Sequence, residues 1–379
     1  MSLAEEILKN LSDTFAICAR TFCGYCVYDC PAFKEYKSEA YTSRGKMNIG
    51  NYILQNLLKP TREVAELYYR CTLCGWCEIN CALENTSVFI KMREYFVEQG
   101  LEPREAKQIL ANFKSYGNIF GVPNSMRVKW AKGLNLSKKG KVLIFAGCNY
   151  PLVPGLGEIL VKAVKVLRKL GIEVAYLFEK EPCCGAPLYM LGYTYLFKEH
   201  ARKVVRILRD ANPNTIVTLC PACVNALRKR YSELGINIGI EILHISEYLD
   251  RLNFPQMRNM NKIVVYHDPC ELARHLRVVE EPRRVLKKAG YNVKELWIHK
   301  GKYTFCCGAG GAHRSLYPDN AASMAMRRIE ELITTKAKII ATSCPACIVN
   351  LRAGILRLFL EDIEVKDLVE LVYESLFTK

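Results

Sequence analysis

A cysteine pattern that occurs twice constrains this chain more than any other feature of its sequence. The first copy has a single cysteine, an adjacent pair followed by glycine, and a C-P-A-C run, which gives Cys148, Cys183, Cys184, Cys220 and Cys223. The second copy keeps this order at Cys270, Cys306, Cys307, Cys344 and Cys347. Matching positions lie 122 to 124 residues apart. A duplication of this length predicts two domains of the same fold, which we call CCG domains after the Cys-Cys-Gly motif.

The residues around each copy indicate α/β domains with parallel sheets. Apolar, strand-like runs lead into the first and last cysteine sites of both copies: "KVLIFAGC" and "TIVTLC", then "KIVVYHDPC" and "KIIATSC". Amphipathic stretches such as "GEILVKAVKVLRKLG" separate these runs. Strands that alternate with helices are typical of βαβ units. We therefore predict two Rossmann-like CCG repeats with parallel sheets.

The five cysteines of each copy are expected to converge on one site. In an open α/β sheet, ligands gather outside the carboxyl ends of the strands. The proline of each C-P-A-C run suits the first turn of a helix, which places both thiolates near helix N–H groups. Neighbouring cysteines form only a strained disulfide and rarely share one tetrahedral zinc ion. We interpret each set as a cage for a multi-iron centre.

The N-terminal cysteines form two further runs. Cys71, Cys74, Cys77 and Cys81 have the C-x2-C-x2-C-x3-C spacing of bacterial-type ferredoxins, although Ala82 replaces the usual proline. The other run is Cys18, Cys23, Cys26 and Cys30, followed by Pro31, and its first gap is four residues instead of two. Zinc sites normally pair two separated C-x2-C knuckles, so packing four cysteines into 11 to 13 residues favours iron–sulfur clusters.

In two-cluster ferredoxins the fourth cysteine of each run binds the other cluster. We therefore assign one 4Fe–4S cubane to Cys18, Cys23, Cys26 and Cys81, and the second to Cys71, Cys74, Cys77 and Cys30. The wider first gap makes Cys18 the weakest of these assignments. A three-iron cluster or a looped-out first turn remains an alternative there.

The distribution of amphipathic, basic and strand-like stretches along the chain predicts its domain organisation. Charged amphipathic stretches such as "PTREVAELYYR" flank the N-terminal cysteines, so we expect residues 1–126 to form a mainly helical, ferredoxin-like domain with two 4Fe–4S clusters. A basic, glycine-containing stretch at 127–140 is expected to be a linker. The first CCG domain is then predicted at 141–259 and the second at 260–379.

Composition limits the compartment and the partners. The chain has 379 residues and 18 cysteines, begins MSLAEEILKN without a signal peptide, and shows no apolar stretch long enough to span a membrane. We therefore expect a cytoplasmic protein whose thiols bind metal, with a peripheral position at the inner face of the cell membrane left open. The formal charge of +16 falls to about +12 if two clusters of charge about −2 are bound. A solvated basic surface explains this charge, and no nucleic-acid-binding motif is present.

A ferredoxin-like module followed by two complete C…CCG…C-x2-C repeats resembles the catalytic iron–sulfur subunit of heterodisulfide reductase in its membrane-associated, two-subunit form. The resemblance covers essentially the whole chain. It implies that the ten cysteines of the two CCG domains hold one or two noncubane 4Fe–4S clusters that reduce the mixed disulfide of coenzymes M and B, or a related di- or trisulfide, to thiols. The two cubanes would carry single electrons to them. It also implies a small disulfide substrate and, as partner, a membrane cytochrome b-like or other redox subunit.

Thiolate products need protons or positive charge nearby. His267, Glu271 and His275, in and after "HDPCELARH", and His313 after the second CCG motif are the candidates. Hydrogen bonding that orients a loop is the alternative role for each. Relatives often carry histidine where Glu271 stands, which weakens the assignment of any one proton donor.

Two other functions fit the same architecture. The chain is similar to non-catalytic electron-transfer subunits that link a flavin dehydrogenase, of the glycerol-3-phosphate or lactate type, to the quinone pool, and to a subunit of dissimilatory sulfur metabolism that acts on a protein-bound trisulfide. Electron-transfer relatives often have one degenerate CCG motif, whereas this chain keeps all ten cysteines. A zinc-stabilised scaffold is the non-redox alternative. We therefore expect a disulfide reductase-type iron–sulfur oxidoreductase.

Overall fold

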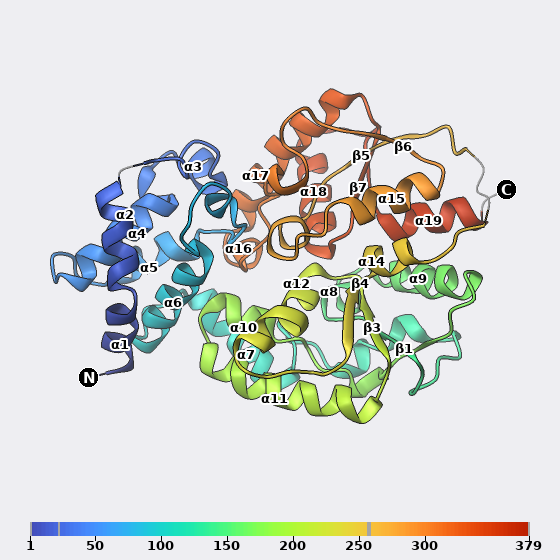
Figure 1. Ribbon diagram of the computed structural model, residues 1–379, viewed down its shortest axis with the longest axis horizontal. Coiled ribbons are helices and arrows are strands. Elements are labelled where there is room, and N and C mark those ends of the chain that lie inside the picture. The colour runs from blue at the N-terminus through green and yellow to red at the C-terminus, as the bar shows by residue number, and fades with distance from the viewer. Residues whose placement is uncertain (1, 22, 256–258, 378–379) are drawn as a thin grey trace.

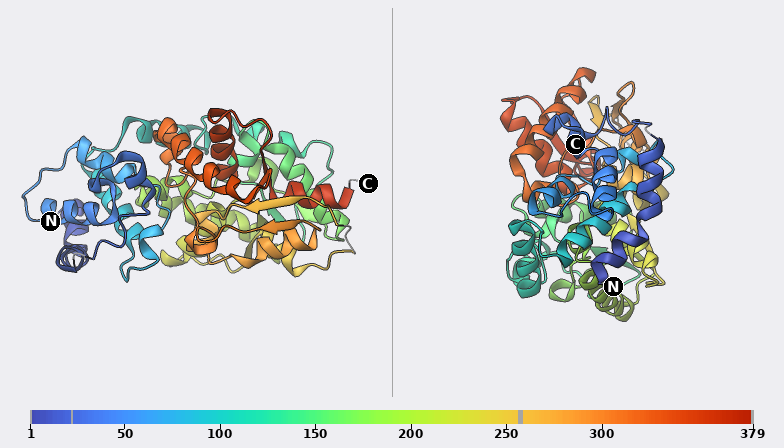
Figure 2. Two further views of the ribbon diagram at one scale, coloured as in Figure 1. Left: turned by 90° about the horizontal axis from the view of Figure 1, so that it is seen from above. Right: turned by 90° about the vertical axis from the view of Figure 1, so that its left-hand side faces the viewer.

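The chain forms a helical N-terminal domain and two α/β domains that lie side by side. The computed structural model describes residues 2–21, 23–255 and 259–377. Figures 1 and 2 show the N-terminal and C-terminal ends at opposite ends of the long axis of the molecule, with the helical domain around the N-terminus. The outer limits of the predicted domains, residues 1 and 379, lie outside the described residues.

The N-terminal domain is mainly helical, which confirms the prediction. Polar N-caps start several helices: the Ser2, Thr42 and Thr61 hydroxyls each accept a hydrogen bond from an N–H of the first turn. Its α-helices are α1 (Leu3–Asn10), α2 (Ser12–Thr21), α3 (Pro31–Tyr36), α4 (Ser43–Leu54), α5 (Arg62–Tyr69), α6 (Asn85–Glu98) and α7 (Arg104–Tyr116). Short 3₁₀ turns, among them Trp76–Glu78 between the cysteines, connect them.

The first CCG domain has a four-stranded parallel sheet in the order β2-β1-β3-β4. Its strands are β1 (Val142–Phe145), β2 (Val174–Ala175), β3 (Thr215–Thr218) and β4 (Glu241–His244). Its helices are α8 (Asn149–Leu152), α9 (Gly157–Lys169), α10 (Ala186–Leu191), α11 (Thr194–Ala211), α12 (Pro221–Val224), α13 (Tyr231–Glu233) and α14 (Ile245–Arg251), with a π-helical stretch at Asn225–Arg230.

The second CCG domain repeats this topology with the order β6-β5-β7-β8, again all parallel. Its strands are β5 (Ile263–Tyr266), β6 (Asn292–Lys294), β7 (Ile339–Thr342) and β8 (Glu364–Asp367). Its helices are α15 (Glu280–Lys288), α16 (His313–Leu316), α17 (Pro318–Leu332), α18 (Pro345–Arg357) and α19 (Leu368–Phe377), with a π-helical stretch at Glu271–His275. The matching strand orders confirm the α/β fold class and the internal duplication.

The central strands are buried because they carry apolar side chains on both faces. All four residues of β1, sequence VLIF, are buried between covering helices, as expected for a parallel sheet. The two CCG domains also contact each other through buried polar groups. The Tyr150 hydroxyl donates to Asp367 Oδ2 at 2.6 Å, and His244 Nε2 lies 3.1 Å from the Ser343 carbonyl oxygen. These contacts place the carboxyl ends of the two sheets near the domain boundary.

The segment predicted as a basic linker is partly packed rather than free. Residues 124–126 and 129–131 form 3₁₀ turns, and Arg127, Trp130 and Ala131 are buried. The Trp130 ring packs against Tyr176, with ring centroids 4.8 Å apart. Lys129 and Lys132 are exposed between these buried residues, and the later residues 137–140 are all exposed. The buried arginine and tryptophan side chains of this segment therefore pack against the first CCG domain.

One arginine connects all three domains. Arg93 on α6 is fully buried. It donates to carbonyl oxygens of Tyr68 (2.8 Å) and Cys71 (2.6 Å) in its own domain. It also donates to Met190 of the first CCG domain (2.6 Å) and to Gly311 of the second (2.8 Å). A planar guanidinium with several donors suits such a junction of backbone carbonyls.

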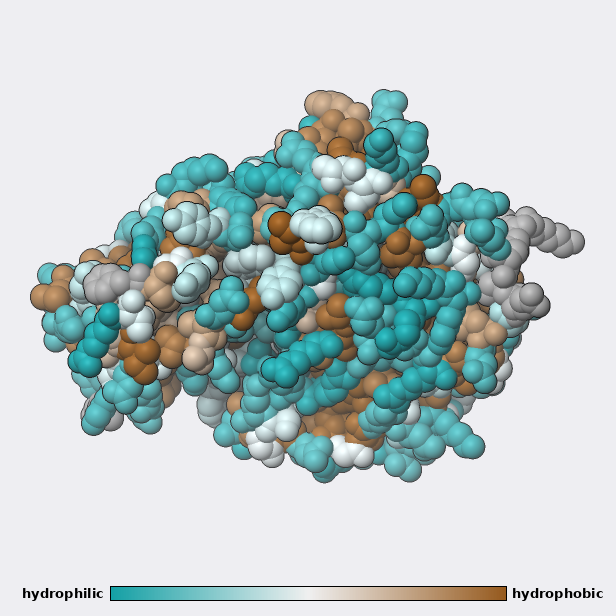
Figure 3. All heavy atoms as spheres, turned by 45° about the horizontal axis from the view of Figure 1, so that its top comes forward, coloured by the Kyte–Doolittle hydropathy of each residue, from teal (hydrophilic) through white to brown (hydrophobic). Residues whose placement is uncertain are grey.

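The face in Figure 3 is mostly hydrophilic, and its hydrophobic residues lie in small groups between polar ones. Among the described residues, no helix combines the length and the apolar character that a bilayer span requires.

Candidate metal centres and the cavity between them

The five cysteines of the second CCG domain converge at the carboxyl ends of its strands. Cys270 follows β5, Cys344 follows β7 and precedes α18, and the adjacent pair lies in the loop before α16. The Cys307 and Cys347 sulfur atoms are 3.3 Å apart. The Cys306 sulfur lies within hydrogen-bond reach of Cys270 and Cys307. All five side chains are buried.

The first CCG domain has the same arrangement. The Cys183 sulfur lies within hydrogen-bond reach of those of Cys148 and Cys184, and the Cys223 sulfur within reach of those of Cys184 and Cys220. All five are buried here too. Pro221 and Pro345 occupy the first turn of α12 and α18, as predicted from the C-P-A-C runs. The structure thus brings together each predicted five-cysteine set.

Both sets line one cavity between the two CCG domains. The space in it that can hold the centre of a water molecule is about 130 Å³, and its walls include cysteines of both sets. Other wall residues are mostly apolar, such as Ile109, Ile119 and Met190. The exceptions include Glu271, which accepts a hydrogen bond from Asn225 at 2.6 Å, and Arg314. A largely apolar cavity with few polar groups is the usual form of a small-molecule site.

The glycine of each CCG motif is required by backbone conformation and by packing. Gly185 and Gly308 have φ values of +76° and +93°, which side-chain-bearing residues rarely adopt. A Cβ on Gly308 would lie 2.7 Å from the Ala321 carbonyl oxygen on α17. Close approach to the helix behind the motif therefore explains Gly308.

A buried ion pair borders the first cysteine set. Arg127 Nη2 donates to the Cys148 sulfur at 3.4 Å, and Nη1 lies 3.5 Å from Glu181 Oε1. The Glu181 carboxylate also accepts backbone N–H groups of Ala146 and Gly147, both at 2.9 Å. Burial raises the pKa of Glu181 to about 8, against the lowering effect of Arg127. The loop that carries Cys148 is therefore held from both sides.

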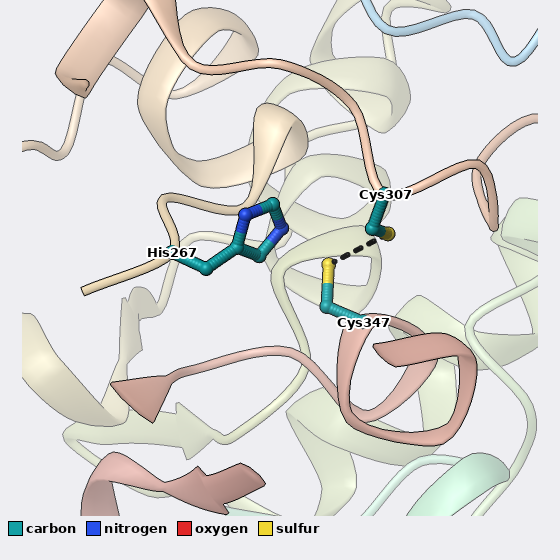
Figure 4. Close-up of side chains that lie close together, drawn as sticks. All are labelled: His267, Cys307 and Cys347. Atoms are coloured by element: carbon teal, nitrogen blue, oxygen red, sulfur yellow. Dashed lines mark hydrogen bonds between the residues drawn. The ribbon is translucent and has the colours of Figure 1, made fainter. Parts of the chain in front are cut away.

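A different polar network borders the second set. His267 is 1% exposed and lies at the end of β5, and Arg328 Nε donates to its Nδ1 at 3.2 Å. Its other nitrogen, Nε2, is buried and has no hydrogen-bond partner among the described residues. A nitrogen of the ring and the Cys307 and Cys347 sulfurs lie within 4.8 Å of one another. Figure 4 shows the imidazole turned toward these two cysteines.

The N-terminal cysteines form two groups, each with members from both runs. Cys18 lies beside Cys23, Cys26 and Cys81. Burial and the nearby thiols raise the pKa of Cys18 to about 11. Cys77 lies beside Cys71, Cys74 and Cys30. Among the first group Cys23 is exposed, whereas Cys74 of the second is buried. The exchange of fourth cysteines between runs thus matches the proximity of the side chains, and Cys18 lies within its expected group.

The inner N-terminal group is adjacent to the second CCG set. The Cys74 and Cys306 sulfurs lie within hydrogen-bond reach, and Cys74, Cys270 and Cys306 form one buried cluster with Trp76 packed against it. Arg274 Nε also donates to the Cys74 carbonyl oxygen. Metal centres held by these two sets would be neighbours, which is the arrangement that electron transfer between them needs.

The proposed proton donors occupy different surroundings. Glu271 lines the cavity, whereas His275 Nε2 contacts the Leu73 carbonyl oxygen at 2.9 Å. His313 is buried, with Nδ1 2.9 Å from the Gly308 carbonyl oxygen and Nε2 2.8 Å from the Tyr36 hydroxyl. Both ring nitrogens of His313 are therefore used in loop contacts, which is the alternative role considered from the sequence.

The cysteine sets fit iron–sulfur clusters. Each site offers four or five cysteine sulfurs, the donors that such clusters require, and a nitrogen of His267 also lies beside the second CCG set. Burial raises the pKa of the Cys30 thiol to about 12. A buried thiol of this kind stays protonated until a bound metal displaces the proton. Groups of four and five sulfurs, all buried or half-buried except Cys23, therefore suit metal coordination.

Four residues at these sites were not predicted from the sequence: Arg127, Glu181, Arg314 and Arg328. None belongs to a cysteine motif, and Arg127 stands in a run of basic residues that indicates solvent exposure. A usable signal is the alternation of this run with apolar residues in "RVKWA", which is untypical of a solvated linker.

Comparisons with known proteins agree with this arrangement. Residues 142–228 and 264–352 match the family described as "Cysteine-rich domain" (CCG), and residues 17–85 match the "4Fe-4S dicluster domain". A chain from a hypothetical protein of Helicobacter pylori has a similar fold, with a TM-score of 0.59 and 11% identity over 100% of this chain and 78% of that one.

Relatives of known name align over most of the chain. A subunit of the dihydromethanophenazine:CoB–CoM heterodisulfide reductase of Methanosarcina acetivorans is 29% identical over 94% of this chain and 93% of its own length. A subunit of the fumarate reductase (CoM/CoB) of Methanothermobacter marburgensis is 28% identical over 96% and 73%. The EtfAB:quinone oxidoreductase of Syntrophomonas wolfei is 28% identical over 82% of this chain and 47% of that protein.

Proposed function

The chain belongs to the iron–sulfur oxidoreductases in which two cysteine-rich CCG domains follow a 4Fe–4S dicluster domain, and from this premise we propose that it reductively cleaves a small disulfide in the cavity between the CCG domains. The reaction takes two electrons and two protons and converts R–S–S–R′ into R–SH and R′–SH. The electrons come from a redox partner. The disulfide of coenzymes M and B, or a related di- or trisulfide, is the proposed substrate.

One observation carries this proposal: all five cysteines of the first set and four of the second, without Cys306, line the same cavity. A subunit that only passes electrons onward needs no space between its centres, whereas a disulfide must reach both centres at once. The clusters, when bound, would supply single electrons, and two of them next to one cavity match the two-electron demand of a disulfide. The clusters and the substrate would share this cavity.

We assign the metal ligands as the sequence predicts. Cys148, Cys183, Cys184, Cys220 and Cys223 would hold one noncubane cluster, and Cys270, Cys306, Cys307, Cys344 and Cys347 the other. Cys18, Cys23, Cys26 and Cys81 would hold the outer cubane, and Cys30, Cys71, Cys74 and Cys77 the inner one. The mutual proximity of the sulfurs within each set supports these assignments.

The cavity walls indicate the kind of substrate. Ile109, Ile119 and Met190 offer apolar surface. The Arg314 guanidinium is half-buried, and it has neither a hydrogen bond nor an ion pair within the part of the chain that the structure describes. Burial lowers the pKa of Arg314, yet arginine keeps its charge in proteins. A disulfide with an aliphatic arm and a carboxylate, sulfonate or phosphate group would match both features.

The partners follow from the relatives. A relative named as one subunit of a reductase indicates a complex with further redox subunits. We propose that electrons arrive from a cytochrome b-like membrane subunit, or from another redox subunit, at the exposed outer cubane site, where Cys23 lies. This arrangement would hold the protein at the inner face of the cell membrane.

A second candidate function is electron transfer between a flavoprotein and quinone. The similarity to EtfAB:quinone oxidoreductase, which extends over 82% of this chain, favours it. Under this alternative the cavity would have no substrate, and added disulfides would not be reduced.

The test is anaerobic oxidation of reduced viologen by the iron-replete protein with a panel of disulfides and trisulfides. We expect turnover with an anionic disulfide such as that of coenzymes M and B. No turnover with any member, together with full iron content and electron delivery to a quinone-linked partner, would favour the electron-transfer function instead.

The variant Arg314→Gln tests the substrate class in the same assay. A hydrogen bond to a charged group contributes about 1.5–3 kcal/mol, so kcat/KM for the anionic disulfide should fall about 10- to 100-fold. With bis(2-hydroxyethyl) disulfide, which has no charge, kcat/KM should stay near the wild-type value. An equal loss with both disulfides would contradict anion recognition by Arg314.

A further inference from the structure

We infer that His267 donates a hydrogen bond to a sulfur atom of the metal centre in the second CCG domain and thereby raises the reduction potential of that centre. The role is a tuning one, because His267 acts on the centre and not on substrate. The inference rests on the cluster assignment of the proposed function but not on the identity of the substrate.

The tautomer of His267 follows from its neighbour. Arg328 can only donate hydrogen bonds, and its Nε lies 3.2 Å from His267 Nδ1. Nδ1 must therefore be the unprotonated acceptor, so the ring proton of the neutral imidazole is on Nε2.

Arg328 is itself firmly held. It is 1% exposed, and its Nη2 donates to the His299 carbonyl oxygen at 3.0 Å and to the Thr304 hydroxyl at 3.3 Å. Nη1 pairs with Glu331. These contacts leave the guanidinium one orientation, and they fix the imidazole through it. Residues of this kind behind a metal site typically set the tautomer and direction of the group in front of them.

The Nε2–H group then has one direction in which to find a partner. It is buried and unpartnered among the described residues, which is costly for a polar group in the interior. The ring faces the Cys307 and Cys347 sulfurs, and a ring nitrogen and these two sulfur atoms lie within 4.8 Å of one another (Figure 4). Sulfur that carries the negative charge of a metal centre is a good acceptor for such a donor, and loading of the site would satisfy the histidine.

A ligand role for His267 is less consistent with the donor set. Five cysteine sulfurs already converge on this site, and the histidine proton occupies the nitrogen that would have to bind iron. Hydrogen bonds to the sulfurs are among the determinants of iron–sulfur reduction potentials. Because a donor stabilises the more negative, reduced state, the His267 bond favours the reduced form of this centre.

The first CCG domain lacks this donor. Phe145 stands at the position that matches His267, three residues before the first cysteine. There Arg127 Nη2 contacts the Cys148 sulfur instead, and Arg127 Nη1 lies 3.5 Å from Glu181 Oε1. The two centres are therefore tuned by different groups at different cysteines, although their cysteine motifs are alike. His267 belongs to the domain that lies next to the inner N-terminal cysteines.

The test is an EPR-monitored redox titration of the iron-loaded full chain without substrate. His267→Phe removes the donor and installs the residue of the first repeat, whereas His267→Gln keeps an N–H donor. We expect His267→Phe to weaken the preference of one CCG centre for its electron about tenfold, a potential drop of about 59 mV for a one-electron couple. His267→Gln should lose less, and the cubane potentials should not move. An unchanged potential in fully loaded His267→Phe would overturn the inference.

A measurement on the wild-type protein covers the case in which His267→Phe loses its cluster. After labelling of histidine with ¹⁵N, electron–nuclear double resonance should detect one weakly coupled nitrogen at one CCG centre. The absence of any histidine coupling, or the strong coupling of an iron-bound nitrogen, would overturn the inference. Because neither experiment needs a disulfide, their outcome is independent of whether the proposed substrate is correct.

Discussion

At the residue scale, Asp367 shows how burial changes the chemistry of one side chain. It is 1% exposed at the end of β8, accepts the Tyr150 hydroxyl at 2.6 Å, and accepts the Val369 N–H at 2.8 Å. Burial raises its pKa to about 7. Of the charged groups around it, Glu370 raises this pKa and Arg352 lowers it.

We predict that the stability of the Asp367→Asn variant relative to the wild type increases as pH rises. The folded state holds the proton up to about pH 7, whereas the unfolded chain releases it near pH 3.8, so wild-type stability falls as pH increases through this window. Asparagine has no proton to lose. Between pH 6 and pH 8 the variant should gain about 1 kcal/mol over the wild type. Thermal unfolding at both pH values measures this difference.

The matched control is Asp362→Asn, in the same domain, because Asp362 is exposed and pairs with Lys338 at the surface. Its melting temperature relative to the wild type should change little between the two pH values. The same gap between Asp367→Asn and wild type at pH 6 and pH 8 would contradict the assignment of a buried, protonated carboxyl group.

Residues differ in how far the sequence reveals them. The cysteines could be predicted because their spacing is itself the signal, and the Pro221 and Pro345 positions followed from the chemistry of helix starts. Glu181 and Arg328 could not, because each meets its partner only through the tertiary fold. Arg328 is 61 residues from His267, and nothing in the local sequence records that distance.

At the scale of elements, the loop and helix of each CCG motif pack closely against a second helix. Gly308 would place a Cβ 2.7 Å from the Ala321 carbonyl oxygen and 2.8 Å from Met324 Cβ, both on α17. Gly171, after α9, has a similar positive φ of +80° but no atom within 4 Å of its Cβ position. An alanine at Gly171 would therefore meet only backbone strain, whereas an alanine at Gly308 would meet backbone strain and a steric overlap with α17.

We predict that Gly171→Ala costs about 1 kcal/mol of stability, since only the left-handed backbone is strained. Gly308→Ala should cost a further 1–3 kcal/mol because α17 must move. Anaerobic thermal unfolding, with iron content as a second readout, checks both values. Equal losses in the two variants would show that α17 does not restrict the CCG loop.

Element prediction succeeded where apolar runs are long. β1, β3, β5 and β7 lie where the apolar runs before the cysteines place them. The edge strand β2 is only two residues long and gives a weaker signal in the sequence. The first half of the predicted linker is packed, because Arg127 and Trp130 contact residues of the first CCG domain that a local pattern cannot show.

At the scale of the whole molecule, Arg93 is the point where the three domains meet. Five carbonyl oxygens, three from its own domain and one from each CCG domain, accept its N–H groups. A buried guanidinium in this position fixes how the N-terminal cysteines face the second CCG domain. The order of the domains was predictable from the sequence, whereas this junction was not.

We predict that Arg93→Met lowers stability by about 3–5 kcal/mol, because it leaves several buried carbonyls without donors. Small-angle scattering should show a larger radius of gyration as the domains separate. Arg62→Met, at an exposed residue on the first turn of α5, is the control and should leave both values unchanged. A compact Arg93→Met protein of wild-type stability would contradict the role of this junction.

The measurement that tests the central claim most directly is thiol production by a variant whose cavity is filled. Ala346, between the two cysteines of the second C-P-A-C run, lines the cavity and is not a proposed ligand. In Ala346→Leu, iron content and reduction by viologen should match the wild type, whereas formation of two thiols per disulfide should fall at least tenfold. Ala353→Leu, on the same helix α18 but away from the cavity, should keep wild-type thiol production. Wild-type rates in a fully loaded Ala346→Leu protein would contradict cleavage of the disulfide between the two CCG domains.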